Sequence, residues 1–273
     1  AKLLTKLGSA LGRIKKLLPG IIGISFFVIL SAFFLTGINN NNSLRNDPGT
    51  GNGSTLDSNS ARISIRGLGN FSFEPSEVET VREDVFVEGA FSVFDILAHL
   101  DKTDKIEMDY YFDEELSTHV ISSLNGDSHW WYSVVYDGGW GESNVFRMDL
   151  YPYKEGAVVS VFPERQERIE RIYSTFAEET ERKNSIELKE NGIIIPEVEI
   201  QGINTSHYFE DVEVRPHNLR SDLFKEGMIT AIDVIMSLGD QGKISCDLQW
   251  YDSIGTARIV KNYFVQRIDD DES

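Results

Sequence analysis

The sequence contains a single cysteine, Cys246, among its 273 residues. One cysteine cannot form an internal disulfide bond, so the hydrophobic core has to hold the fold together. The motif spacings of common catalytic and metal sites are also absent. The five histidines are scattered, and there is no HExxH, GxSxG, CxxC or phosphate-binding glycine loop. We therefore expect no enzymatic activity, no metal site and no cofactor.

Basic residues are scarce, because 26 Lys and Arg stand against 44 Asp and Glu and leave a net charge of −18. Binding to a phosphate backbone needs a basic surface, so this acidic composition excludes nucleic acid as a partner. One segment departs from the pattern. Residues 1–19 carry five basic side chains and no acidic one.

A long hydrophobic run follows this basic segment, over residues 20–38, and it contains no charged residue. A helix of this length, rising about 1.5 Å per residue, spans the hydrocarbon layer of a bilayer. With basic residues on its N-terminal side, the run predicts a single-pass transmembrane helix at the cell membrane, with a cytoplasmic N-terminus and an extracellular body. The leucines of residues 1–19 recur at helical spacing, which predicts an amphipathic segment bound to membrane lipid. A cleaved signal peptide and a buried core helix are the alternatives.

The rest of the chain divides by composition. Residues 39–60 consist mainly of Asn, Gly and Ser, which predicts a flexible stalk. We expect a first domain at 61–162, a linker helix within 163–190, and a second domain, shortened or truncated, at 191–273. Four acceptor sequons permit N-glycosylation of a secreted chain: Asn41, Asn52, Asn70 and Asn204.

An internal repeat defines the two domains. Residues 86–112 align without a gap with residues 224–250, at a constant offset of 138 residues. The identical pairs include Phe86/Phe224, Glu88/Glu226, Gly89/Gly227, Asp95/Asp233, Leu100/Leu238, Lys105/Lys243, Ile106/Ile244 and Asp109/Asp247. So many matches together with one apolar pattern indicate two copies of the same structural unit.

Each copy has the pattern of two strands, a helix and two strands. Ser92 and Thr230 precede the two helices, and Asp95 and Asp233 follow three residues later, which predicts a capping box in each. A short helix across a small mixed sheet is the simplest way to bury such a pattern. The predicted fold class is α+β, with the transmembrane helix followed by two tandem β-grasp-like domains.

Residues 129–156 hold most of the tryptophans and many tyrosines of the chain. Aromatic side chains on a hairpin can form a stacking platform for a ligand or partner, and an arginine can add a cation–π contact. The candidate contact residues are Trp130, Tyr132, Trp140, Arg147 and Tyr153. In the alternative, the alternating residues of a strand cover both faces of a sheet, and these aromatics belong to the core.

Four segments of the first copy resemble the transcobalamin C-terminal-like domain family of β-grasp modules. They are the helix entry at 89–97, the strand at 118–126, the aromatic hairpin at 129–132 and the closing segment at 151–161. The resemblance covers about residues 63–162, with a weaker echo in the second copy. It implies a β-grasp module of a secreted or anchored surface protein. Some relatives bind cobalamin together with a helical partner domain, which this sequence lacks.

Taken together, these patterns predict a membrane-anchored cell-surface protein that binds an extracellular protein or a small molecule through tandem domains. A structural protomer or spacer of a homo- or hetero-oligomeric surface assembly is the main alternative. An extracellular enzyme and a cobalamin-binding protein are further alternatives.

Overall fold

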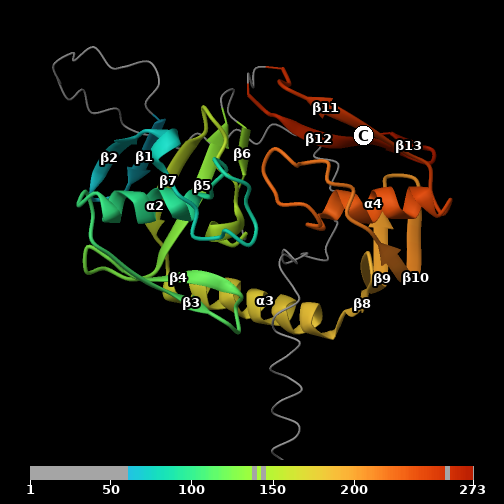
Figure 1. The fold of residues 1–273 in the computed structure, drawn as a ribbon, viewed down its shortest axis with the longest axis horizontal. Coiled ribbons are helices and arrows are strands. Elements are labelled where there is room, and N and C mark those ends of the chain that lie inside the picture. The colour runs from blue at the N-terminus through green and yellow to red at the C-terminus, as the bar shows by residue number, and fades with distance from the viewer. Residues whose placement is uncertain (1–60, 137–139, 143–145, 256–258, 273) are drawn as a thin grey trace, which may run out of the picture.

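The computed structural model describes residues 61–272, except 137–139, 143–145 and 256–258. This part is a mixed α+β fold rich in strands, with two units joined by one long helix (Figure 1). The predicted amphipathic segment, membrane span and stalk, which together make up residues 1–60, lie outside the described residues.

The predicted fold class requires correction. Within the described ranges, no helix combines the length and the apolar character needed to cross a bilayer. The longest, α3 (Gln166–Ser185), is 20 residues long, but charged side chains cover much of its surface. The predicted fold class was a transmembrane helix followed by two β-grasp-like domains. The described part of the chain is instead a mixed α+β fold without a membrane-spanning helix.

The first unit is built on a five-stranded sheet in the order β2-β1-β7-β5-β6. β1 and β7 run parallel, and the other neighbours are antiparallel. The strands are β1 (Ala61–Ile65), β2 (Gly69–Phe73), β5 (Trp130–Tyr136), β6 (Trp140–Glu142) and β7 (Val158–Pro163). The short 3-10 helices η1 (Pro75–Glu77) and η2 (Met148–Leu150) lie in the connections. A separate hairpin pairs β3 (Met108–Asp113) with β4 (Thr118–Leu124).

Helix α2 (Val93–Lys102) packs its apolar side chains into the core of this unit. Its first turn is closed by Ser92, whose Oγ accepts a hydrogen bond from the Asp95 N–H at 3.2 Å. In return, the Asp95 carboxylate accepts from the Ser92 N–H at 2.6 Å. The same exchange joins Thr230 and Asp233 at the start of α4 (Ala231–Asp240), so both predicted capping boxes are confirmed.

The second unit has two three-stranded sheets where the sequence predicted one small mixed sheet. One has the order β10-β9-β8 and the other the order β11-β12-β13, and α4 lies between them (Figure 1). The strands are β8 (Glu187–Lys189), β9 (Gly192–Gln201), β10 (Ser206–Val214), β11 (Cys246–Tyr251), β12 (Asn262–Ile268) and β13 (Asp271–Glu272). The apolar faces of α4, β9 and β10 form one core.

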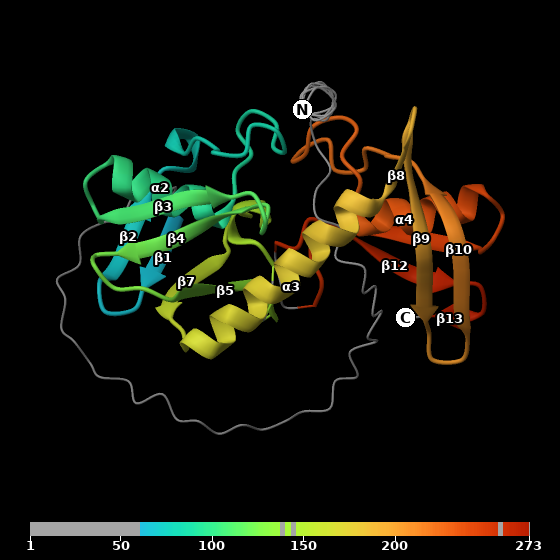
Figure 2. The ribbon, with the colours of Figure 1, turned by 90° about the horizontal axis from the view of Figure 1, so that it is seen from below.

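Helix α3 falls within the predicted linker segment 163–190, and it packs firmly on the first unit. Ile169, Ile172 and Phe176 are buried in the core of that unit. The helix leads directly into β8 of the second unit, as Figure 2 shows. The linker therefore belongs structurally to the first unit.

The two units meet through corresponding residues of the repeat. The Val87 N–H donates to the Leu223 carbonyl at 3.0 Å, and the Lys225 N–H donates to the Val85 carbonyl at 2.9 Å. At the repeat offset, Val85 corresponds to Leu223 and Val87 to Lys225, so each bond is the counterpart of the other. This reciprocity is the signature of a two-fold contact, as in symmetric dimers. The repeat thus folds as an internal pseudo-dimer.

Candidate functional site

An open groove of about 800 Å³ lies over the central strands β1 and β7 of the first sheet, where the second unit meets it. Most of its lining comes from β1, β2 and the segment that leads into β7, and the second unit contributes one side chain. The residues with side chains suited to recognition are Arg62, Asn70, Phe91, Tyr153, Glu155 and Ile259. Aromatic, cationic, anionic and amide groups therefore face one space.

The alternation of β1 and β7 explains the composition of the groove. Ile63 and Val159 point into the core and are almost completely buried. Their neighbours Arg62 and Val158 are exposed on the groove side, and Val158 retains 57% of its surface. Because successive side chains of a strand point to opposite faces, the same strands supply both the core and the groove.

Tyr153, one of the predicted contact residues, lies in this groove. Its ring stacks on Phe91 with centroids 5.2 Å apart and meets Phe73 edge-on at 5.5 Å. Burial, followed by the nearby charge of Glu155, raises the pKa of Tyr153 to about 12. The hydroxyl consequently stays protonated at physiological pH and can donate a hydrogen bond.

The second unit closes one end of the groove. The Lys154 ammonium donates to the Val260 carbonyl at 3.2 Å, which ties the wall of the groove to the segment before β12. Ile259 lies against Gly156, and a methyl group added there would approach the Ile259 Cδ1 to 3.0 Å. The shape of the groove therefore depends on how the two units are joined.

Two other predicted contact residues are in the core, the alternative that the sequence left open. Trp130 and Tyr132 retain 4% and 1% of their surface. The Trp130 indole N–H donates to the Asp127 carbonyl at 2.8 Å, and the Tyr132 hydroxyl donates to the Phe146 carbonyl at 3.1 Å. Trp140 begins β6, but its side chain lies outside the described part of the structure.

Arg147 is buried as well, and it holds α3 against the first unit. Its Nε donates to the Leu116 carbonyl at 3.0 Å, and Nη1 pairs with the Glu179 carboxylate at 2.5 Å. Nη2 donates to the Phe176 carbonyl at 3.0 Å, and the guanidinium lies 4.4 Å from the centre of the Phe176 ring. The structure thus places this arginine at a structural junction away from the groove.

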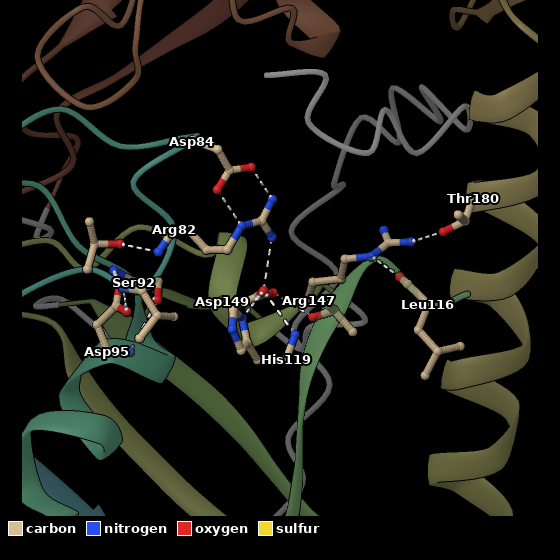
Figure 3. A network of polar contacts seen from close by, with 12 residues as sticks. Arg82, Asp84, Ser92, Asp95, Leu116, His119, Arg147, Asp149 and Thr180 are labelled. Carbon is tan, nitrogen blue, oxygen red and sulfur yellow. Dashed lines mark hydrogen bonds and ion pairs between the residues drawn. The ribbon is translucent and has the colours of Figure 1, made fainter. Parts of the chain in front are cut away.

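A buried polar network centred on Asp149 lies beside Arg147, as Figure 3 shows. The Asp149 carboxylate accepts from Arg82 at 2.9 Å, from the Thr118 hydroxyl at 2.5 Å and from the His119 N–H at 3.0 Å. Burial alone raises the pKa of Asp149, but the hydrogen bond from His119 and the charge of Arg82 outweigh it and hold the pKa below its usual value. Both oxygens of this carboxylate therefore accept hydrogen bonds from within the fold.

The internal repeat could have revealed part of this network, because Arg82 of the first copy corresponds to an arginine of the second copy. Arg82 forms a two-pronged ion pair with Asp84, and Arg220, at the repeat offset, forms the same pair with Asp222. Asp149 has no such signal, since it lies in the part of the first unit that the alignment does not cover.

The sequons fall in different settings. Asn70 is exposed beside the groove. Asn204 donates its side-chain amide to Asp271 at 2.7 Å, so the nitrogen that would carry a glycan already has a partner. Asn41 and Asn52 lie outside the described residues.

Within the described ranges, no three His, Cys, Asp or Glu side chains come together as metal ligands would.

No protein-family model, no curated protein and no solved structure matches this chain. The resemblance to the transcobalamin C-terminal-like domain family therefore stays a prediction.

Proposed function

We propose that the protein is a non-catalytic binding protein that presents the groove beside Tyr153 to a protein partner. The observation that carries the proposal is the composition of this groove, to which both units contribute side chains. Aromatic side chains held in place by their neighbours are effective contact residues because little conformational entropy is lost when they bind.

The lining suggests which chemistry the groove accepts. Arg62 is exposed, and among the described residues it has no ion-pair partner. The Phe91–Tyr153 stack and Val158 provide apolar surface nearby. A peptide segment with an apolar side chain next to a carboxylate would match both features, through a charge-assisted contact with Arg62 and burial against the stack.

Selection of binders from a random peptide library, displayed on phage and panned against the full chain, tests this proposal. We expect the selected peptides to combine an acidic residue with an aromatic or aliphatic one. The dissociation constant of such a peptide, measured by calorimetry, should rise about tenfold or more with Arg62→Ala, which is the loss of one charged contact. The matched control is Arg171→Ala, because Arg171 is exposed on the outer face of α3. Equal weakening by both variants, or no effect of Arg62→Ala, would contradict the proposal.

One observation favours the alternative, a protomer of a larger assembly. The β3 strand exposes three consecutive aromatic side chains, Tyr110, Tyr111 and Phe112, which retain 39%, 51% and 41% of their surface. Exposed aromatic clusters of this kind mark protein contacts. Light scattering of the full chain during size-exclusion chromatography separates the two functions, because filaments or large oligomers support an assembly and a discrete monomer supports the binding protein.

A further inference from the structure

The two units differ at one edge of their sheets. In the first unit, β1 lies between β2 and β7. Its counterpart β9 pairs with β10 on one side, and on the other side β8 covers only Gly192 to Ile194 (Figure 2). No strand among the described residues pairs with this edge of β9 from Ile195 onward.

The repeat shows which residues of β9 correspond to β1. Ile63 and Ile65 in β1 and Val198 and Ile200 in β9 are all buried, and each strand opens an antiparallel hairpin. Ser64 therefore corresponds to Glu199.

The backbone of β1 at this position faces β7. Ser64 stands opposite Ser160 in the parallel register, and the Arg66 N–H donates to the Val161 carbonyl at 2.8 Å. Because alternate residues of a strand direct their backbone groups to opposite neighbours, the Glu199 N–H and C=O face the open edge of β9.

The open edge of β9 differs in charge from the corresponding edge of β1. Glu197 and Glu199 are exposed on β9, and Glu210 opposes Glu197 across the β9–β10 pair. Loss of hydration, followed by the charge and hydrogen bonding of Glu197, raises the pKa of Tyr208 on the same face. A strand added here would meet negative charge on its solvent side.

We propose that the edge of β9 from Glu197 to Gln201 binds an extended segment of a partner protein as a parallel strand, in the place that β7 occupies in the first unit. The segment carries β-branched residues on the face toward the core and lysine or arginine at the positions between them. Main-chain hydrogen bonds then supply the affinity and the alternate side chains the selectivity, as in other cases of strand addition. Pro196 and the glutamates protect the edge against indiscriminate pairing. This site is separate from the groove beside Tyr153 and does not depend on it.

The chain itself supplies the probe, a synthetic peptide with the sequence of residues 157–163 that carries Ser160→Lys and Phe162→Lys. We expect it to bind the full chain and to slow hydrogen exchange of the amides between Glu197 and Gln201. A peptide with Ser160→Glu and Phe162→Glu in its place should bind more weakly than the unmodified sequence, because like charges then face each other.

Backbone methylation of the probe tests the direction of the contact without altering the protein. Methylation of the Val161 nitrogen should weaken binding about tenfold, the equivalent of one hydrogen bond. Methylation of the next nitrogen toward the N-terminus of the peptide, which faces away from β9, should leave affinity unchanged. In the protein, Glu199→Pro should abolish binding, whereas Glu199→Ala, which keeps the N–H, should retain it.

Three results would overturn the proposal: no binding of the lysine-bearing peptide at millimolar concentration, equal effects of the two methylations, or protection confined to segments outside β9.

Discussion

Phe86 and Phe224 stack on each other with their ring centroids 5.6 Å apart and an angle of 30° between the rings. They are corresponding residues of the repeat, and they form an antiparallel bridge between the two units. Around them, Val85, Ala90 and Met228 are buried in a small core of their own. The axis that relates the two copies therefore passes near this aromatic pair.

A double-mutant cycle measures the contribution of this pair. Phe86 is fully buried, so Phe86→Ala should lower the free energy of unfolding by about 3–5 kcal/mol. Phe224 is only partly buried, and Phe224→Ala should cost less. The double variant should lose about 0.5–1.5 kcal/mol less than the two single losses combined, because each ring is the partner of the other. Urea unfolding of the full chain provides the values, and strict additivity would show that the stacking contributes nothing.

Arg147 is expected to contribute to stability rather than to binding. Arg147→Ala removes the contacts to α3 and the hydrogen bond to the Leu116 carbonyl, and it leaves Glu179, which retains 6% of its surface, as a buried charge. Breaking a buried ion pair from one side costs about 3–5 kcal/mol. Arg147→Lys should recover only part of this loss, since a lysine cannot reach several acceptors at once. Unfolding free energies and hydrogen exchange of α3 are the measurements, and wild-type stability of Arg147→Ala would refute the assignment.

Asp149 should make the stability of the first unit sensitive to acid. Its pKa in the folded state is below the value in the unfolded chain, about 3.9. Ionised Asp149 therefore stabilises the fold above that pH, and this contribution is lost as the pH falls toward the folded-state pKa. Asp149→Asn should be less stable than wild type at pH 7, and the difference should shrink below about pH 4. Thermal unfolding between pH 7 and pH 2 tests this, and a constant difference over the range would contradict it.

Gly89 and Gly227 occupy the same place in the two copies with nearly the same backbone, at φ +83° and +88°. No atom lies within 4 Å of a methyl group added at either position, so an alanine meets only the backbone penalty of the left-handed region. Each Gly→Ala change should cost about 1 kcal/mol.

Gly239 is the matched control for this pair of glycines. It lies inside α4, where alanine is the better helix former, and an added methyl group would meet only the Cys246 sulfur at 3.3 Å. Gly239→Ala should therefore cost less than either of the other two changes, because the helical backbone favours alanine and a shift of the Cys246 side chain by a few tenths of an ångström relieves the contact. Equal losses at all three glycines would show that the left-handed backbone is not the cause.

The sequence predicted local features well where one short pattern determines one structure. The capping boxes at Ser92 and Thr230 follow from a serine or threonine three residues before an aspartate, and both exist. The repeat offset also identified Phe86 and Phe224 as equivalent. It did not indicate that the two phenylalanines touch, because equivalence says nothing about how copies are placed relative to each other.

The candidate site was harder to predict because burial depends on distant segments. Trp130 and Tyr132 look like surface aromatics in a hairpin, but both are buried in the core of the first unit, where the Tyr132 ring meets the ring of Tyr151 with centroids 5.8 Å apart. The sequence predicted Arg147 as a contact residue for a ligand, but its guanidinium pairs with Glu179, some thirty residues later in the chain. Tyr153 could be proposed from its aromatic character, while Arg62 and Ile259 come to the same groove only through the tertiary fold.

Hydrogen exchange of the full chain with and without a library-selected peptide tests the central claim most directly. Binding in the groove should slow exchange of amides in residues 61–64 and 153–159 and next to Ile259, and it should leave the β3–β4 hairpin unchanged. Protection confined to that hairpin, with no change along the groove, would contradict the account.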